Sequence, residues 1–256
     1  MQKYEFTGAV KDVSVYNCDS VYSTEVHQIR AVSDFGSVHS GDIGGWISSD
    51  RNLSQTGTCW IGPNVAVTED SMVLHNAKCY GNGVISGYSL ICENAFINSD
   101  DFQIRDCHLL GNSKILSKWF RNRAFFRMVG NSKIDADRIT ISERINIPEN
   151  VHIKYTDDII SLMISDDREF DDGRHLCIFP DENRNLIISS FLCPGIRVDK
   201  DPYGWPLEEY FKRLDKSDLP YDDKMVYRYF IEIARFIIGK HPKPNLNNKK
   251  GELTNE

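Results

Sequence analysis

Two histidines stand in stretches that read as turns, where an imidazole can move a proton near neutral pH. His75 lies in "VLHNAKCYGN" and His108 lies in "DCHLLGN". At a turn, either ring could face solvent and act as a general base. An ordinary surface or corner histidine is the simpler interpretation, because no partner carboxylate can be placed from the sequence.

The segment from Ser117 to Arg127, "SKWFRNRAFFR", combines cations with aromatic rings. From Asp101 to Lys133, basic residues outnumber acidic ones in a chain whose net charge is -7. Such a mixture suits phosphates and stacked bases, and it also suits the acidic stretch 156–224 or another protein. We expect a protein contact, within the chain or with a partner, and keep nucleic acid as a lesser alternative. The candidate partner-binding residues are Lys118, Trp119, Arg121, Arg123, Phe125 and Arg127.

The rest of the sequence argues against a metal site, a disulfide framework and a membrane-spanning helix. The seven cysteines are odd in number and none forms a C-x-x-C pair, so we expect neither a metal site nor a disulfide framework and favour a reducing cytoplasm. No apolar run approaches the roughly 20 residues of a membrane helix, so no membrane contact is expected. No secretory signal is visible, although export by a specialised secretion system leaves no such mark.

A repeat of six residues must position these side chains. Every sixth residue from Ile61 to Ile97 is apolar, and the residue two places before each of them is small or compact. The apolar steps are Ile61, Val67, Val73, Cys79, Ile85, Ile91 and Ile97. The compact positions are Cys59, Val65, Ser71, Ala77, Gly83, Ser89 and Ala95. A period of six fits neither a helix nor an alternating hairpin and is typical of a hexapeptide β-solenoid, with about 18 residues in each coil.

The repeat predicts a left-handed triangular β-solenoid over about residues 31–155, preceded by a strand pair or cap at 1–30. Its phase slips by one residue after Ile97, and "LLGNSKI" from Leu109 returns as "MVGNSKI" from Met128, one residue later than a regular coil would place it. The segment 117–127 has no hexad register, so we expect it to leave the solenoid wall as a loop. We expect its Trp119 and Phe125 to pack on the coils or on the acidic C-terminal stretch.

After Tyr155 the pattern changes to a small α+β unit at 156–240. Apolar runs around 157–201 predict strands, with "DENRN" as a hairpin loop. A helix is predicted to open at Pro206, and a second is predicted to begin at the Asp222 cap and end near Gly239. The polar tail 241–256 is expected to be disordered.

The stretch Ala31–Ile61 carries a family resemblance. Its "AVSDFGSVHSGDIGGWISSDRNLSQTGTCWI" resembles the opening of YdcK-type hexapeptide-repeat β-solenoid proteins of enterobacteria and their phages, and the resemblance extends over about the first three-fifths of the chain. The matching residues are Asp34, Phe35, Gly44, Gly45, Trp46, Leu53, Ser54, Gly57, Cys59 and Trp60. Hexapeptide acyltransferases share this solenoid, so the resemblance implies acyl-CoA, with His75 or His108 as the general base.

We expect a non-catalytic solenoid scaffold without a cofactor, which binds another macromolecule, foremost a protein, in a bacterial or prophage setting. Oligomerisation is compatible with this interpretation. The alternative is an acetyltransferase of the hexapeptide-repeat group that uses acetyl-CoA, and the missing histidine–carboxylate pair weighs against it. An effector delivered into a host cell is a further alternative.

Overall fold

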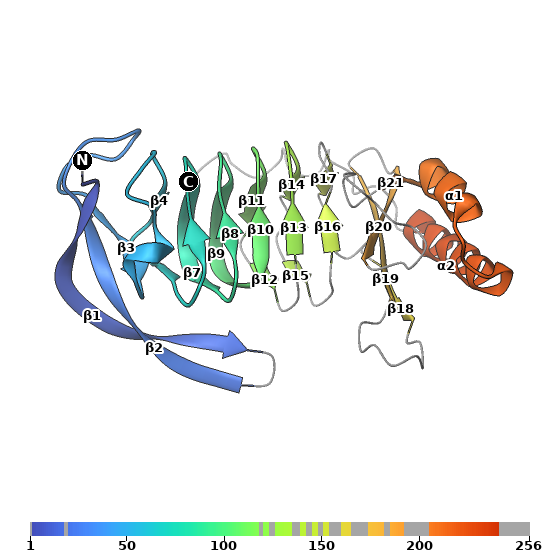
Figure 1. Ribbon diagram of the computed structural model, residues 1–256, viewed down its shortest axis with the longest axis horizontal. Helices are drawn as coiled ribbons and strands as arrows, with labels where there is room; N and C mark the ends of the chain where they lie inside the picture. The colour runs from blue at the N-terminus through green and yellow to red at the C-terminus, as the bar shows by residue number, and fades with distance from the viewer. Residues whose placement is uncertain are drawn as a thin grey trace, which may run out of the picture.

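Coils stack along the long axis of the molecule, between an N-terminal strand pair and a C-terminal unit that ends in two helices (Figure 1). The computed structural model describes residues 2–17, 20–117, 120–122, 126–134, 139–141, 145–147, 151–153, 160–164, 174–181, 185–191 and 205–240. The predicted mainly-β solenoid followed by a small α+β unit is confirmed. Its left-handed sense and the domain boundaries stay predictions.

The elements follow one another from hairpin to coils to C-terminal unit. The hairpin and coil strands are β1 (Tyr4–Asn17), β2 (Ser20–Ala31), β3 (Ile43–Ile47), β4 (Trp60–Ile61), β5 (Val65–Val67), β6 (Met72–Val73), β7 (Lys78–Ser86), β8 (Leu90–Ile91), β9 (Phe96–Arg105), β10 (Cys107–Leu109), β11 (Lys114–Ser117), β12 (Phe120–Asn122), β13 (Phe126–Met128), β14 (Lys133–Ile134), β15 (Ile139–Ile141), β16 (Ile145–Ile147) and β17 (His152–Ile153), with the 3-10 helix η1 (Asp50–Asn52) after β3. The C-terminal elements are β18 (Ile160–Ile164), β19 (Arg174–Pro180), β20 (Leu186–Phe191), β21 (Trp205–Pro206), α1 (Leu207–Lys216) and α2 (Tyr221–Lys240).

Rows of parallel strands form the walls of the solenoid. One row is β6-β8-β10-β13-β16, and the long strands β7 and β9 contribute to two further rows as they pass a corner. Lys78 pairs with Phe96, which pairs with Lys114, so each coil here returns to the same place after three hexads. Lys114 then pairs with Lys133, where three further hexads would have reached Ser132. This extra residue accounts for the 19-residue separation of "LLGNSKI" and "MVGNSKI". The slip predicted after Ile97 coincides with a register shift between β7 and β9, where Gly81 pairs with Ser99 but Gly83 pairs with Phe102.

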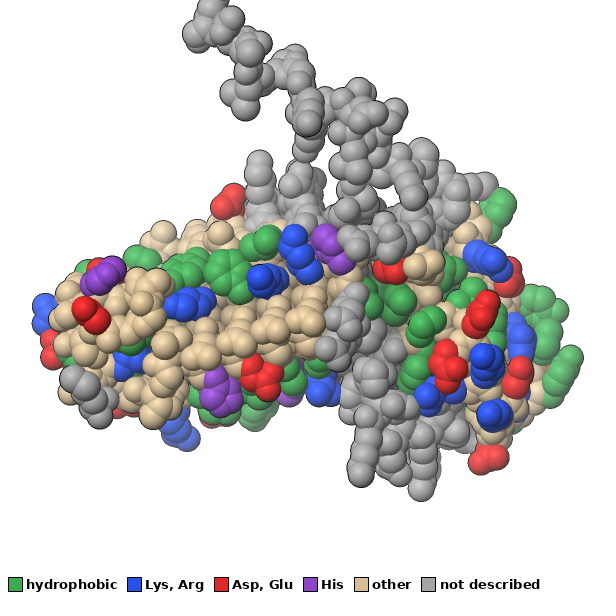
Figure 2. All heavy atoms as spheres, turned by 90° about the horizontal axis from the view of Figure 1, so that it is seen from above, with side chains coloured by type: hydrophobic (Ala, Val, Ile, Leu, Met, Phe, Trp, Pro, Cys, Tyr) green, Lys and Arg blue, Asp and Glu red, His purple; other side chains and the backbone are tan. Residues whose placement is uncertain are grey.

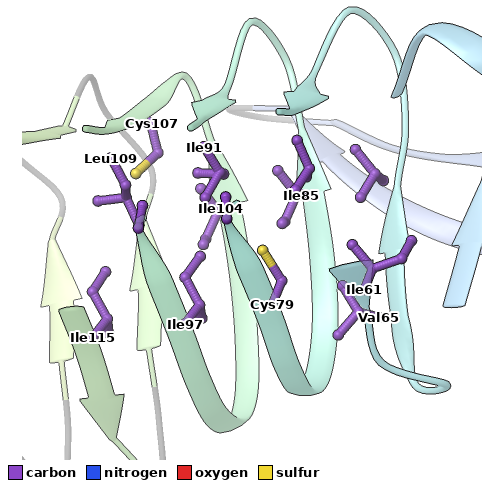
Figure 3. Packing of buried hydrophobic residues seen from close by; sticks show 14 of the residues in the cluster. Ile61, Val65, Cys79, Ile85, Ile91, Ile97, Ile104, Cys107, Leu109 and Ile115 are labelled. Atoms are coloured by element: carbon purple, nitrogen blue, oxygen red, sulfur yellow. The ribbon is translucent and has the colours of Figure 1, made fainter. Parts of the chain in front are cut away.

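The interior consists of stacked aliphatic columns. All seven predicted inward positions from Ile61 to Ile97 are 0% exposed. Figure 3 shows the side chains of Ile61, Cys79, Ile97 and Ile115 following one another inside the coils, as their register requires. Because each coil covers the next, the apolar area is removed from water without a second layer.

The compact positions leave room near the corners. A Cβ added to Gly83 would lie 2.2 Å from the carbonyl oxygen of Phe102 and 2.5 Å from its ring. Phe102, one coil later, is 0% exposed. The glycine therefore makes space for a ring that the next coil supplies.

The segment 117–127 does not leave the wall where the structure describes it. Phe120 of β12 pairs in register with Phe102 and with Ile139, so the expected loop is wrong for this part. Phe126 of β13 is 0% exposed and pairs with Cys107. Aromatic rings replace aliphatic side chains without breaking the coil, which the hexad pattern cannot reveal. Lys118, Trp119, Arg123 and Phe125 lie outside the described residues.

The C-terminal unit is an antiparallel sheet, β18-β19-β20-β21, with α1 and α2 packed beside it. Pro206 precedes α1, which begins with two glutamates and ends with basic residues, as the helix dipole favours. The helices share a core with Ile178, Ile188 and Trp205. None of the helices in the described part of the chain is long and apolar enough to cross a membrane.

Candidate functional site

His108 lies on the outer side of the row β6-β8-β10-β13-β16. It pairs in register with Leu90 of the preceding coil and with Arg127 of the following one. Its side chain is half-buried, and its Nε2 lies 3.3 Å from the carbonyl oxygen of Tyr88. The ring is therefore held in one orientation beside a corner of the coil.

The surroundings of His108 favour the neutral ring at pH 7. Burial is the largest cause and lowers the pKa of the imidazole, and the nearby Arg127 charge lowers it further. The hydrogen bond to Tyr88 and the Asp106 carboxylate act in the opposite direction, with the smaller effect. A neutral ring that donates its Nε2 proton to Tyr88 carries its acceptor lone pair on Nδ1.

Asp106 and Tyr88 connect His108 to its corner. Asp106 has a positive φ of 54° and accepts a hydrogen bond at Oδ1 from the Tyr88 N–H, at 2.8 Å. Tyr88 thus contacts both side chains, with its N–H bound to Asp106 and its carbonyl oxygen close to the His108 ring. The sequence offered no such partner, because the connection passes through a residue one coil earlier.

An ion pair between Arg105 and Glu69 lies next to this corner. Arg105 donates two hydrogen bonds to the Glu69 carboxylate, at 2.9 and 3.2 Å, and its Nε lies 3.8 Å from Asp106 Oδ2. Burial would raise the pKa of Glu69, but hydrogen bonds from Tyr22 and the Gly87 N–H together with the Arg105 charge hold that pKa below its usual value. The Tyr22 hydroxyl comes from β2, so the N-terminal hairpin contributes to the corner.

His75 occupies a different corner and is less suited to catalysis. It is exposed, has a positive φ of 58°, and accepts a hydrogen bond at Nδ1 from the Glu93 N–H, at 3.2 Å. With Nδ1 accepting this bond, the neutral ring carries its proton on Nε2. His75 therefore links two coils and offers no free lone pair at Nε2 for accepting a proton.

The structure describes two of the six residues proposed for partner binding, Arg121 and Arg127, and they belong to different strands. Arg127 lies beside His108, and Arg121 belongs to β12, where it pairs with Gln103 and Thr140. Their role in binding a partner stays a prediction. Within the described ranges, no group of three His, Cys, Asp or Glu residues could hold a metal ion.

Comparisons with known proteins confirm the resemblance to YdcK. No family model matches the chain. It is 29% identical, over 102 residues, to a protein of Escherichia coli K12 named uncharacterized acetyltransferase YdcK, which covers 40% of this chain and 31% of that protein. It is also 29% identical, over 79 residues, to the bifunctional protein GlmU of Thermodesulfovibrio yellowstonii, which covers 29% of this chain and 18% of that protein. The chain thus spans less than a third of the length of these two curated relatives.

These similarities correct the function expected from the sequence. The non-catalytic scaffold is the wrong interpretation, because the similar protein YdcK is named an acetyltransferase. The acyltransferase alternative is better supported. The scaffold was preferred because no carboxylate could be paired with a histidine from the sequence, and the register now brings Asp106 to the N–H of Tyr88, the residue whose carbonyl oxygen contacts His108.

Proposed function

We propose that the protein is an acyl-CoA-dependent acyltransferase with His108 as its general base. The observation that carries this proposal is the half-buried imidazole held at the Tyr88 carbonyl oxygen beside Asp106, where burial lowers the pKa of the ring. The similarity to YdcK supports the reaction class. His75 has no catalytic part in this proposal.

His108 would take a proton from the hydroxyl or amine of an acceptor at Nδ1. The Nε2–H bond to Tyr88 would persist, and Asp106 would favour the positive ring that forms. Bound acetyl-CoA would supply the activated acyl group as a thioester. The same ring would then return its proton to the departing thiolate, so that His108 ends the cycle neutral.

The residues near His108 fit a ligand that carries phosphates. Arg127 pairs in register with His108 on the neighbouring strand, and neighbouring strands lie about 4.8 Å apart. On another wall, Lys114, Lys133 and His152 succeed one another in register. Figure 2 shows basic and histidine side chains in line along one side of the solenoid. Cations arranged in this way favour anionic groups such as the phosphates of CoA.

Acetyl-CoA binding and CoA release together test this proposal. Calorimetry with acetyl-CoA should show saturable binding, and thiol release should rise with a panel of hydroxyl and amine acceptors. His108→Ala should lower kcat by about 100-fold or more, the usual contribution of a general base. His75→Ala, as the matched control, should leave kcat within about threefold. The absence of saturable acetyl-CoA binding would overturn the function, and an active His108→Ala enzyme would overturn the base.

The cytoplasm is the compartment that we propose for this activity. Cys59, Cys79, Cys92 and Cys107 are buried free thiols in the coils. Thiols persist where the surroundings are reducing. Fractionation of cells that express the untagged chain should recover it with cytoplasmic markers, and recovery with periplasmic or extracellular markers would contradict this placement.

A further inference from the structure

Lys3 is a buried lysine whose amine lies against the sulfur of Cys59. Lys3 is 4% exposed and Cys59 is 0% exposed. Lys3 Nζ lies 3.1 Å from Cys59 Sγ and 2.9 Å from the Cys59 carbonyl oxygen, and it lies over the Phe35 ring. Lysines are seldom buried to this degree unless they are paired. An amine and a thiol thus share an enclosed site that the acyltransferase proposal does not use.

The backbone around this pair is fixed by hydrogen bonds between β1 and the segment that leads into β4. The N–H groups of Lys3 and Tyr4 both donate to Gln55 Oε1, at 2.8 and 3.3 Å. The Tyr4 hydroxyl donates to the carbonyl oxygen of Leu53, at 2.7 Å. The contact between the Lys3 amine and the Cys59 sulfur is therefore supported by bonded backbone on both sides.

The enclosed site suits both a thiolate and, after it, a neutral amine. Burial is the largest effect on Lys3 and lowers the pKa of its amine, whereas the hydrogen bond with Cys59 and the charge of its thiolate raise that pKa by less. A cation beside a thiol stabilises the thiolate, which is the form that reacts with peroxides. Once the thiolate is consumed, the ammonium has lost this counter charge, and burial then favours the neutral, nucleophilic amine.

We propose that Lys3 and Cys59 form an oxidative cross-link, a sulfenamide between Nζ and Sγ, when the protein meets hydrogen peroxide. The Cys59 thiolate attacks one peroxide oxygen and the O–O bond breaks, so that the sulfur is oxidised to a sulfenic acid and the peroxide is reduced. The departing hydroxide takes a proton from the Lys3 ammonium and leaves as water. The proposal is independent of the acyltransferase activity.

The second step joins the two side chains. The neutral Lys3 amine attacks the sulfur of the sulfenic acid, the S–O bond breaks, and the hydroxyl leaves with one amine proton as a second water. One thiol, one amine and one peroxide thus give one S–N bond and two waters. A sulfenic acid condenses with a nearby nitrogen or thiol when one is in reach. At Cys59 the nitrogen in reach is Lys3 Nζ.

The other buried thiols of the coils are less suited to this reaction. Burial raises the pKa of the thiols of Cys79, Cys92 and Cys107, which keeps them protonated and unreactive. Cys59 instead has the Lys3 amine against its sulfur. Among the four free thiols that the structure describes, we therefore expect Cys59 to be the one that peroxide converts to a cross-link.

One short loop separates the Cys59 sulfur from water. Sγ lies 3.5 Å from the Ser54 carbonyl oxygen and 3.8 Å from that of Thr56, and residues 55–57 are exposed. Hydrogen peroxide is small enough to reach the sulfur when this loop opens locally. We therefore expect the reaction to be slower than that of a surface thiol. The amine is already in contact, so it captures the sulfenic acid before a second peroxide enters.

The cross-link would fasten the hairpin of β1 and β2, at the N-terminal end of the molecule, to the coils (Figure 1). It closes a loop between residues 3 and 59 and so restricts the unfolded chain. The melting temperature should rise by about 5 °C or more after peroxide treatment. Thiol reductants reverse sulfenamides, so the rise should disappear with dithiothreitol.

Peptide mapping of the peroxide-treated full chain tests the cross-link. After the free thiols are alkylated, the protein is digested with trypsin without a reductant. In the linked chain trypsin no longer cuts after residue 3, so peptide 1–11 should appear joined to peptide 52–78. The joined mass should be about 2 Da below the sum of the two peptides, since two hydrogens are lost. Treatment in urea should not give this product, because the reaction depends on the folded contact.

Three variants separate the cross-link from general oxidation. Cys59→Ser should abolish the joined peptide and the rise in melting temperature. Lys3→Arg keeps a cation but removes the attacking amine, so it should leave Cys59 to advance to the sulfinic acid. Cys92→Ser is the matched control, because it removes another buried coil thiol, and it should still give the joined peptide. Native protein in which peroxide yields only sulfinic acid or a disulfide at Cys59, with Lys3 still cut by trypsin, would overturn the proposal.

Discussion

The solenoid and helix α2 bury apolar side chains in different ways. In the solenoid, Ile85 lies opposite Val67 of the preceding coil and Ile104 of the following one, and all three are at most 1% exposed. In α2, Ile231 is 0% exposed while Ile233, two residues later, is 57% exposed. Burial in the coils follows from position in the repeat. Burial in the helix depends on which other element lies against each face.

The largest loss of stability is expected from a change at Ile85 in the solenoid. Ile85→Asp should lower the free energy of unfolding by about 4 kcal/mol or more, because it places an unpaired charge between two apolar neighbours. Urea denaturation followed by circular dichroism measures this loss. Tyr229→Asp, at a side chain of α2 that is 64% exposed, should have little effect. Equal losses in the two variants would break the comparison.

Two isoleucines of the same helix sharpen the contrast. Ile231→Ala should cost about 2–4 kcal/mol, because it opens a cavity against the C-terminal core. Ile233→Ala should change the stability of the monomer by less than about 0.5 kcal/mol, since its side chain leaves little behind. Chemical unfolding at about 1 μM protein compares them directly. A large loss from Ile233→Ala would indicate that its face is covered within one chain.

The inward columns of the solenoid could be predicted because one pattern serves every coil. Ile61, Ile97 and Ile115 are all buried as the period requires. The fold of the aromatic segment 117–127 was harder to predict. Periodicity cannot show that a glycine such as Gly83 leaves room for an aromatic ring such as that of Phe102 inside the coils. The backbone of Phe120 pairs in register with Phe102, so a change of residue class was taken for a break in the fold.

The candidate site could be predicted only in part. His108 was recognisable from its type and its place near a turn. Its connection to Asp106 passes through Tyr88, and its contact with Arg127 crosses to the next coil. Both need the register of neighbouring coils, including the extra residue. The sequence predicted helix α2 from its cap and its end, but it does not say which of its apolar side chains the sheet covers.

Two asparagines test polar stacking within the solenoid. Asn52 is 0% exposed, and its Nδ2 donates to the carbonyl oxygens of Glu69 and Ser71, at 3.0 and 2.8 Å. Asn52→Ala should cost about 1–3 kcal/mol, because it leaves buried carbonyls without donors. Asn94 forms an exposed ladder with Asn76 and Asn112, and Asn94→Ala should cost less than about 0.5 kcal/mol. Thermal unfolding ranks them, and the reverse order would contradict the role assigned to burial.

The smallest expected effect concerns the outer side of the coils, where register also couples residues. Arg127 faces His108 from the next coil and lowers the pKa of its imidazole. Arg127→Gln should therefore raise that pKa, because the protonated ring no longer meets a like charge. In the native protein, His108 should reduce stability as the pH falls below about 6.5, since the unfolded chain takes up the proton first.

Histidine NMR titration of both proteins measures this pKa, with His108→Gln identifying the signal. The acid limb of kcat/KM should move to higher pH in Arg127→Gln if His108 is the general base. Arg51→Gln serves as the control, because Arg51 is exposed in η1 and does not affect the pKa of His108. An unchanged pKa of His108 in Arg127→Gln would show that residues in register on the outer face of neighbouring coils do not affect each other's charge. The register would then predict interactions only among the interior side chains.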